Sequence, residues 1–118
     1  MTEIKSYKDL IVWQKSIELT KAVYTITADF PKSETYALTS QMQRAAVSIA
    51  SNIAEGHTRN HTNEFIQFLS IANGSVSELE TQIIIAKSQY QKIDYQTIDN
   101  LLNEIQRMLN VLIKKLKS

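Results

Sequence analysis

The chain has 118 residues, enough for one domain with a single hydrophobic core, and 43% of them are hydrophobic while 21% are charged. Its 13 basic and 12 acidic residues give a formal net charge of +1, without the strong basic excess typical of nucleic-acid-binding domains. The absence of cysteine excludes disulfides, a thiol nucleophile and cysteine-based zinc sites. No signal-peptide core and no apolar run of ~18 residues is present, so we expect a cytoplasmic protein.

Residues that interrupt helices are scarce: the chain has two glycines, Gly56 and Gly74, and one proline, Pro31. Turns between β-strands usually need Gly, Pro or Asn at fixed positions, so this scarcity predicts few and long helices. Short connections near Pro31, at 56–61 and at 91–93 would make successive helices antiparallel. We therefore predict an all-α fold: a single domain over residues 1–118, built as a left-handed, antiparallel, up-down-up-down four-helix bundle.

The first helix, which begins near Leu10, has two apolar stripes. At ~100° per residue, one face carries the apolar residues Leu10, Trp13, Ile17 and Tyr24. The nearly opposite face carries Val12, Leu19, Val23 and Ile26. A surface helix of a monomer buries one stripe, and a second stripe would be an exposed apolar patch. We therefore expect a homo-oligomer, in which the face between copies consists of Val12, Leu19, Val23 and Ile26.

The second helix is expected from about Ser33 to Glu55, with Gly56 as the residue that ends it. Spacings of three and four residues give it a core face of Leu38, Met42, Ala45, Ile49 and Ile53. A polar stripe runs beside this face and consists of Gln41, Arg44, Ser48, Asn52 and Glu55. Polar groups at the edge of a core need hydrogen-bond partners, so this stripe should face another helix.

The third helix offers such partners. It is expected to begin after Thr62, and its apolar residues run from Phe65 to Tyr90 at helical spacing. A second polar row of Ser75, Glu78 and Gln82 lies beside that seam, and we attribute Gly74 to close helix packing. We predict a structural polar network, with an ion pair between Arg44 and Glu78, whose members are Gln41, Arg44, Ser48, Asn52, Glu55, Ser75 and Glu78.

Two alternative hypotheses assign chemistry to these regions. One makes the polar stripe of the second helix a catalytic site, although no histidine lies near Ser48 along the chain to act as its base. The other makes His57 and His61, four residues apart and followed by Glu64, metal ligands on a continuous helix. Because Gly56 is expected to end the helix before both histidines, we expect no functional metal site. Because Ser48 has no nearby base, we expect no enzyme activity.

The fourth helix follows Asp94 and has the clearest amphipathic pattern, with a seam from Ile98 to Leu116. The lysines near its C-terminus suit the helix dipole. With a net charge of +1, RNA binding would need a local basic patch. The candidate RNA-contacting residues are Lys8, Lys15 and Lys21, Arg59 in the connection after the second helix, and Lys114, Lys115 and Lys117.

Four segments resemble one known family, in the same order along the chain. They are DLIVWQKS at 9–16, FP at 30–31, LTSQMQRAAVSIASNIAEG at 38–56 and EFIQFLSIANGSVSELET at 64–81. The family consists of small four-helix bundle proteins encoded in intervening sequences of bacterial large-subunit ribosomal RNA genes. The positions that match its pattern are Trp13, Gln41, Arg44, Ser48, Asn52, Glu55, Gly56, Gly74 and Glu78.

The resemblance implies structure and assembly rather than catalytic chemistry. The family is also similar to the accessory protein of diversity-generating retroelements, a bundle that assembles as a five-membered barrel and assists a reverse transcriptase. By this resemblance we expect a homopentamer. We also expect a non-enzymatic scaffold for RNA or a protein partner, without a cofactor, a membrane or a small-molecule substrate.

Overall fold

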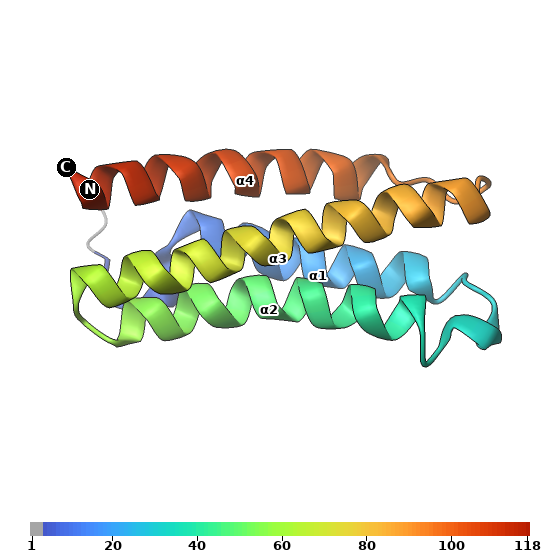
Figure 1. Ribbon diagram of the computed structural model, residues 1–118, viewed down its shortest axis with the longest axis horizontal. Helices are drawn as coiled ribbons and strands as arrows, with labels where there is room; N and C mark the ends of the chain where they lie inside the picture. Colours follow the sequence, from blue (N-terminus) through green and yellow to red (C-terminus); the bar gives the residue numbers. More distant parts are fainter. Residues whose placement is uncertain (1–3) are drawn as a thin grey trace.

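Four long helices form the protein, whose structure, a computed structural model, describes residues 4–118 (Figure 1). They are α1 (Ile11–Thr27), α2 (Leu38–Thr58), α3 (Thr62–Gln89) and α4 (Gln96–Lys117). Short 3-10 helices at Tyr7–Asp9 and Lys32–Glu34 precede α1 and α2, and the described residues contain no strand. The predicted all-α fold with four helices is confirmed.

Successive helices run in opposite directions, so the molecule has two distinct ends (Figure 1). At one end the start of α1, the α2–α3 connection and the C-terminus of α4 come together; we call residues 5–9, 57–62 and 112–118 the basic end. At the other end lie the α1–α2 and α3–α4 connections; we call residues 28–37 and 90–95 the tyrosine end. None of the described helices is long and apolar enough to cross a membrane. The left-handed sense of the bundle stays a prediction.

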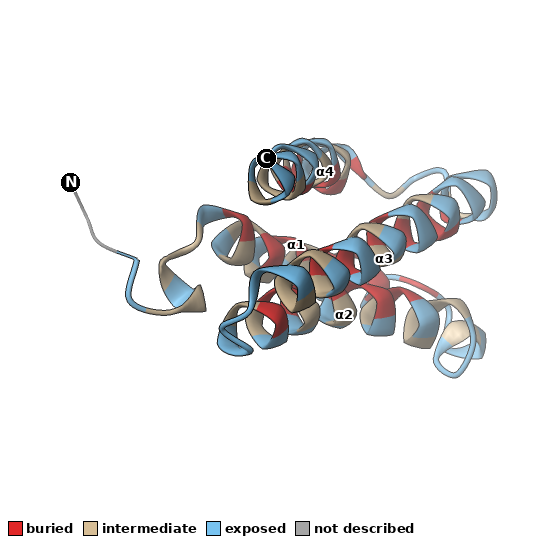
Figure 2. Cartoon of the chain, turned by 60° about the vertical axis from the view of Figure 1, so that its left-hand side comes forward, coloured by how far each residue is buried: buried red, intermediate tan, exposed pale blue. Residues whose placement is uncertain are grey.

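The four helices do not pack equally tightly. The contact between α2 and α3 is the most extensive, whereas α4 packs less extensively against α1 and α3. Figure 2 shows the buried residues on the inward sides of the four helices, with α4 lying against α1 and α3 from one side. The structure is therefore a close α2–α3 pair to which α1 and α4 are added.

The core uses the predicted seams of α2, α3 and α4. On α3 the fully or almost fully buried seam residues are Leu69, Ala72, Val76, Leu79, Ile83 and Ala86. On α2 they are Met42, Ala45, Ile49 and Ile53, and on α4 they are Ile98, Leu102, Ile105 and Leu109. The α4 seam is only half-buried at Leu112 and Leu116, so burial of this helix fades toward its C-terminus.

The prediction for α1 is wrong about which stripe faces outward. Val12, Leu19, Val23 and Ile26, assigned from sequence to an interface between copies, are at most 9% exposed and lie in the core of the single chain. This stripe packs between α2 and α4, and the polar residues beside it do not prevent burial. Ser16 and Thr27 are themselves buried because their hydroxyls donate to the carbonyls of Val12 and Val23, each at 2.8 Å.

The helix boundaries differ from the prediction mainly at α2. Instead of starting at Ser33, the chain forms the 3-10 helix Lys32–Glu34 after Pro31, and α2 begins at Leu38. Instead of ending at Gly56, α2 continues to Thr58. The predicted caps of the other helices lie close to their observed starts: the Asp94 carboxylate accepts a hydrogen bond from the Gln96 amide at 2.9 Å, and α3 begins at Thr62 itself.

Neither glycine has its predicted role. Gly56 was expected to end a helix, but it is buried inside α2, where an added Cβ would lie 2.6 Å from the Cβ of Phe68. Gly74 was expected to allow close packing, but it is exposed on α3, and an added Cβ would meet nothing within 4 Å. The close approach of α2 and α3 therefore depends on Gly56, and no contact within the chain requires Gly74.

Alanine substitutions at the two glycines should have opposite effects on stability. Gly74→Ala should raise the free energy of unfolding by about 0.5–1 kcal/mol, because glycine is unfavourable in a helix and the new methyl group enters open space. Gly56→Ala should lower it, since the Cβ of Phe68 is attached to the α3 backbone and cannot move without separating the helices. Urea titration followed by circular dichroism measures both changes, and equal changes of the same sign would contradict this assignment.

Candidate functional site

A short polar network joins α2 to α3 near the middle of both helices. The hydroxyl oxygens of Ser48 and Ser75 lie 2.9 Å apart. The Asn52 side-chain amide donates to the Ser48 hydroxyl at 3.0 Å and to the Ser48 carbonyl at 2.8 Å. Ser48, Asn52 and Ser75 therefore form the hydrogen-bonded centre of the network that the two polar rows predicted.

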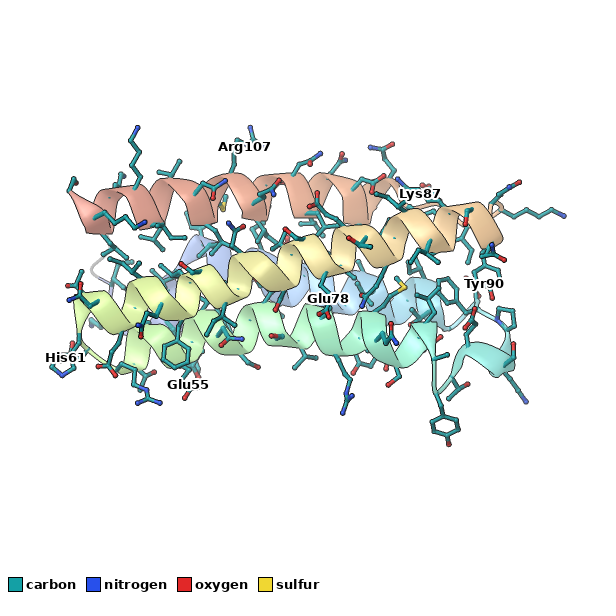
Figure 3. The ribbon with its side chains drawn as sticks, in the orientation of Figure 1. Glu55, His61, Glu78, Lys87, Tyr90 and Arg107 are labelled. Carbon is teal, nitrogen blue, oxygen red and sulfur yellow. The ribbon has the colours of Figure 1, made fainter. Side chains whose placement is uncertain are left out.

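The outer members of the predicted network do not take part. Gln41, Arg44, Glu55 and Glu78 are all exposed, and the ion pairs among the described residues do not include one between Arg44 and Glu78. Figure 3 shows Glu55 pointing away from the bundle. Arg44 and Glu78 are exposed although Ser48 and Ser75, about one turn away on the same helices, are in contact. The predicted Arg44–Glu78 ion pair is therefore wrong.

The network has the chemistry of a structural contact. A serine nucleophile needs a base within hydrogen-bond reach, and the described partners of Ser48 and Ser75 are another hydroxyl and an amide. Gln82, the last residue of the α3 polar row, is 6% exposed, and its Oε1 has no partner in the described structure. It was not assigned to the network, although its place in the row was a usable signal.

The two histidines lie at the basic end but do not form a metal site with Glu64. His57 is half-buried in the last turn of α2, where its ring meets the edge of Phe65 at a centroid distance of 5.6 Å. His61 is exposed just before α3 (Figure 3). Within residues 4–118, no three His, Asp or Glu side chains come together as a ligand set.

Arg59 is held in place at the α2–α3 connection. Its guanidinium lies 3.0 Å from a carboxylate oxygen of Glu55 and 3.7 Å from one of Glu64. It also lies over the ring of Phe68, 5.3 Å from the centroid. Two carboxylates already neutralise this charge, so Arg59 contributes little free positive potential to a nucleic-acid surface.

The fold places only some of the candidate RNA-contacting residues at the same end of the bundle. Lys8 and the lysines Lys114, Lys115 and Lys117 are exposed at the basic end, and none of them is in an ion pair with another described residue. Lys15 instead bridges α1 and α4, with its Nζ 3.4 Å from Glu104 and 3.7 Å from Glu18. Lys21 lies about 9 Å further along α1, where it is exposed.

The second stripe of α1 contributes to an apolar surface with α2. Tyr24 is 49% exposed and Val47 of α2 is 43% exposed, and both line a shallow pocket of about 340 Å³ that also touches Arg44. Ile17, two turns earlier on the same face of α1, is half-buried. The apolar surface on this side of the bundle therefore consists of Ile17, Tyr24 and Val47.

The tyrosine end contains a hydrogen-bonded cluster that the sequence analysis missed. Tyr90, at the end of α3, donates its hydroxyl proton to the carboxylate of Glu34 and packs on Phe30 with ring centroids 4.9 Å apart (Figure 3). Tyr95 donates to the Tyr90 carbonyl at 3.0 Å. The hydrogen bond to Glu34, burial and the negative charge of Glu34 raise the pKa of Tyr90, and burial raises the pKa of Tyr95. The cluster therefore links the α1–α2 connection to the α3–α4 connection.

Comparison with known proteins identifies a family and finds similar solved structures. The family model described as 23S rRNA-intervening sequence protein matches residues 8–111. The chain belongs to this family. A crystal structure of a protein of unknown function from the S23 ribosomal protein family of Bacteroides thetaiotaomicron is 25% identical, with a TM-score of 0.77, and the match covers 88% of this chain and 99% of that one. No curated protein matches the chain.

Membership of the 23S rRNA-intervening sequence family confirms the resemblance found in the sequence. The matched range contains the polar network, Gly56 and the tyrosine end, but it stops before Lys114, Lys115 and Lys117. The family and the similar structure carry no assigned activity that would identify a catalytic residue. The family match therefore gives no information about a function of Lys114, Lys115 and Lys117.

The raised pKa of Tyr90 predicts a loss of stability in alkaline solution. A phenol whose pKa is higher in the folded than in the unfolded state stabilises the fold below pH ~10, and this contribution disappears as the pH rises further. Tyr90→Phe should therefore be less stable than the unmodified protein at neutral pH, and the difference should shrink as the pH rises above about 10. Urea titrations across this range measure it.

The matched control for this test is Tyr36→Phe. Tyr36 is 97% exposed, so its phenol makes no comparable contact and the variant should unfold as the unmodified protein does. A Tyr90→Phe stability difference that stays constant between neutral and alkaline pH would contradict the proposed linkage.

Proposed function

We propose that this protein is a non-enzymatic, homo-oligomeric scaffold of the cytoplasm that binds RNA through the basic end of its bundle. The observation that carries the proposal is the presence at one end of the bundle of Lys8, Lys114, Lys115 and Lys117, all exposed and without an ion-pair partner among the described residues. Lys8 precedes α1 and the other three lie in the last turn of α4, so they share this end because α1 and α4 are antiparallel. Unpaired ammonium groups bind phosphate by releasing counterions from the nucleic acid.

The modest charge of one chain makes repetition important. A net charge of +1 gives little long-range attraction, so a single basic end would bind RNA weakly. Several copies in one assembly present the same patch several times, which converts later contacts into intramolecular ones and raises avidity. The five subunits implied by the retroelement resemblance would provide such repetition.

We assign the contact between copies to the surface formed by Ile17, Tyr24 and Val47. The reasoning that required a partner for one stripe of α1 still holds, but the stripe that needs it is the outer one. Tyr24 and Val47 expose an apolar surface on neighbouring helices around a shallow pocket, and such patches commonly mark association sites. Arg44 at its edge adds a charged rim, as protein interfaces often have.

The RNA proposal predicts an effect that depends on where a charge lies. Changing Lys114, Lys115 and Lys117 to Gln should weaken binding of an RNA hairpin at least tenfold at low salt. It should also reduce the slope of log affinity against log salt by about 2.7, near 0.9 for each of the three lost phosphate contacts. Gel-shift titration over a series of salt concentrations measures both quantities.

A control with the same loss of charge tests whether position matters. Changing Lys21, Lys32 and Lys92 to Gln removes three exposed lysines away from the basic end and should leave the salt slope unchanged. The proposal fails if the intact oligomer retains no structured RNA at low salt, or if both triple variants lose affinity equally. Circular dichroism verifies that α4 remains helical without its terminal lysines.

The assembly proposal predicts that outer and inner stripe substitutions behave differently. Tyr24→Glu combined with Val47→Glu should give a folded monomer of about the chain mass of 13.5 kDa, because charges replace the apolar contact surface. Leu19→Glu should instead unfold the chain, since Leu19 is 0% exposed and an unpaired buried charge is very unfavourable. Light scattering and circular dichroism separate these outcomes.

Thr25→Glu, an exposed control on α1, should change neither the oligomeric state nor the fold. A monomeric unmodified protein at micromolar concentration would refute the assembly.

A further inference from the structure

The apolar stripe of α4 continues beyond the point where the chain covers it. All buried residues of α4 precede or include Leu109, yet Val111, Leu112, Ile113 and Leu116 follow on the last two turns. Val111 is 53% exposed, and the other three are half-buried. Two turns of a strongly amphipathic helix therefore lack a complete partner, which is unfavourable for a large apolar surface in water.

A groove runs along this uncovered part of α4. Its volume is about 620 Å³, and the segment before α1 forms its other wall. The main apolar residues that line it are Ile4, Ile11, Met108, Val111 and Leu112. Ile4 and Ile11 are 51% and 61% exposed, so the groove has an apolar floor and apolar edges that the chain leaves open.

The acidic and the basic side chains that line the groove differ in whether they have partners. Asp9 lines it, but its carboxylate accepts hydrogen bonds from the amides of Lys5 and Ser6 at 2.8 and 3.2 Å. Glu104 also lines it and is paired with Lys15 at 3.4 Å. Arg107 and Lys115 line the same groove, and neither is in an ion pair with any residue from 4 to 118. The two charged groups of the groove that lack a partner are therefore both cations, and Figure 3 shows Arg107 on the outer side of α4.

The spacing along α4 gives the length of the expected occupant. The lining residues Glu104, Met108, Val111 and Lys115 recur every three or four residues, and they cover about 16 Å or three helical turns. An amphipathic helix of about the same length would place apolar side chains at matching intervals into such a groove. A nucleic-acid strand would not cover this floor, since its backbone offers phosphates rather than an apolar ridge.

We propose that the groove between residues 4–12 and the second half of α4 binds an amphipathic helix of a partner protein, with acidic residues beside its apolar face. The apolar face covers Ile11, Met108 and Val111, and the acidic residues meet Arg107 and Lys115. Charge complementarity of this kind selects the orientation and the partner, while apolar burial supplies most of the affinity. The site is separate from the RNA proposal in its residues Ile11, Arg107 and Val111.

A synthetic peptide of defined chemistry tests the proposal on the full chain. The probe is a fluorescent peptide of about 18 residues with Leu on one helical face, Glu beside that face and Ala elsewhere, long enough to form helix on binding. Two controls keep its length: one has every Glu replaced by Lys, and the other has the same composition in scrambled order. Fluorescence anisotropy should show the Glu peptide binding at least tenfold more tightly than either control.

Variants then locate the contact and its charge. Val111→Asp should weaken binding of the Glu peptide at least tenfold, whereas Ile84→Asp, at an isoleucine 68% exposed elsewhere on the bundle, should leave it unchanged. Arg107→Glu should reverse the preference toward the Lys peptide. Circular dichroism confirms that each variant is folded, which is expected because the substituted side chains are exposed.

Three results would overturn the proposal. The first is equal binding of all three peptides, or binding that Val111→Asp does not change. The second is dissociation of an oligomer by Val111→Asp in light scattering, which would make the groove an interface between copies of this chain. The third is loss of co-sedimentation with phosphatidylglycerol vesicles in Val111→Asp when no peptide binds, which would make it a membrane-binding surface.

Discussion

The close contact between α2 and α3 around Gly56 determines how the rest of the molecule is arranged. The Cβ of Phe68 occupies the space where a side chain at position 56 would lie, and hydroxyl groups from both helices meet about two turns further along, at Ser48 and Ser75. Small residues and short hydrogen bonds fix both the distance and the register of this pair. The position of every other element is then set relative to it.

The remaining helices pack less tightly, and this difference creates the two surfaces to which we assign binding. α1 buries its stripe of Val12, Leu19, Val23 and Ile26 between α2 and α4, which leaves its other stripe on the outside. α4 is buried only as far as Leu109, so its last two turns leave one wall of a groove open. Both surfaces are apolar faces of regular helices that the chain does not itself cover.

The sequence predicts periodic features well because helical burial repeats along a single element. The seams of α2, α3 and α4 could be listed from spacing alone, since each helix has one dominant apolar face. It does not decide between alternatives that have the same local pattern. The two stripes of α1 are equally apolar, and only packing against α2 and α4 determines which is buried. Likewise Gly56 looks like a helix terminus until the position of Phe68 is known.

Contacts between segments distant in sequence were the least predictable part of the candidate site. Glu34 and Tyr90 are separated by 56 positions, and no periodic pattern connects a 3-10 turn with the end of α3. The same holds for the basic end, where Lys8 and the lysines of α4 share one end of the bundle only because the helices are antiparallel. The Arg44–Glu78 pair was also wrong, because both side chains are exposed although Ser48 and Ser75, about one turn away on the same helices, are in contact.

The two ends of the bundle differ in how far their polar groups are already satisfied. At the tyrosine end, hydrogen bonds join Tyr90 to Glu34 and Tyr95 to the Tyr90 carbonyl. At the basic end, Lys114, Lys115 and Lys117 have no described acidic partner, and Lys115 also lines the groove along α4. An acidic helix in the groove would therefore neutralise a charge that the RNA surface uses. Since coupling free energy is reciprocal, each ligand would weaken binding of the other, and the bundle would act as a scaffold that exchanges one partner for the other.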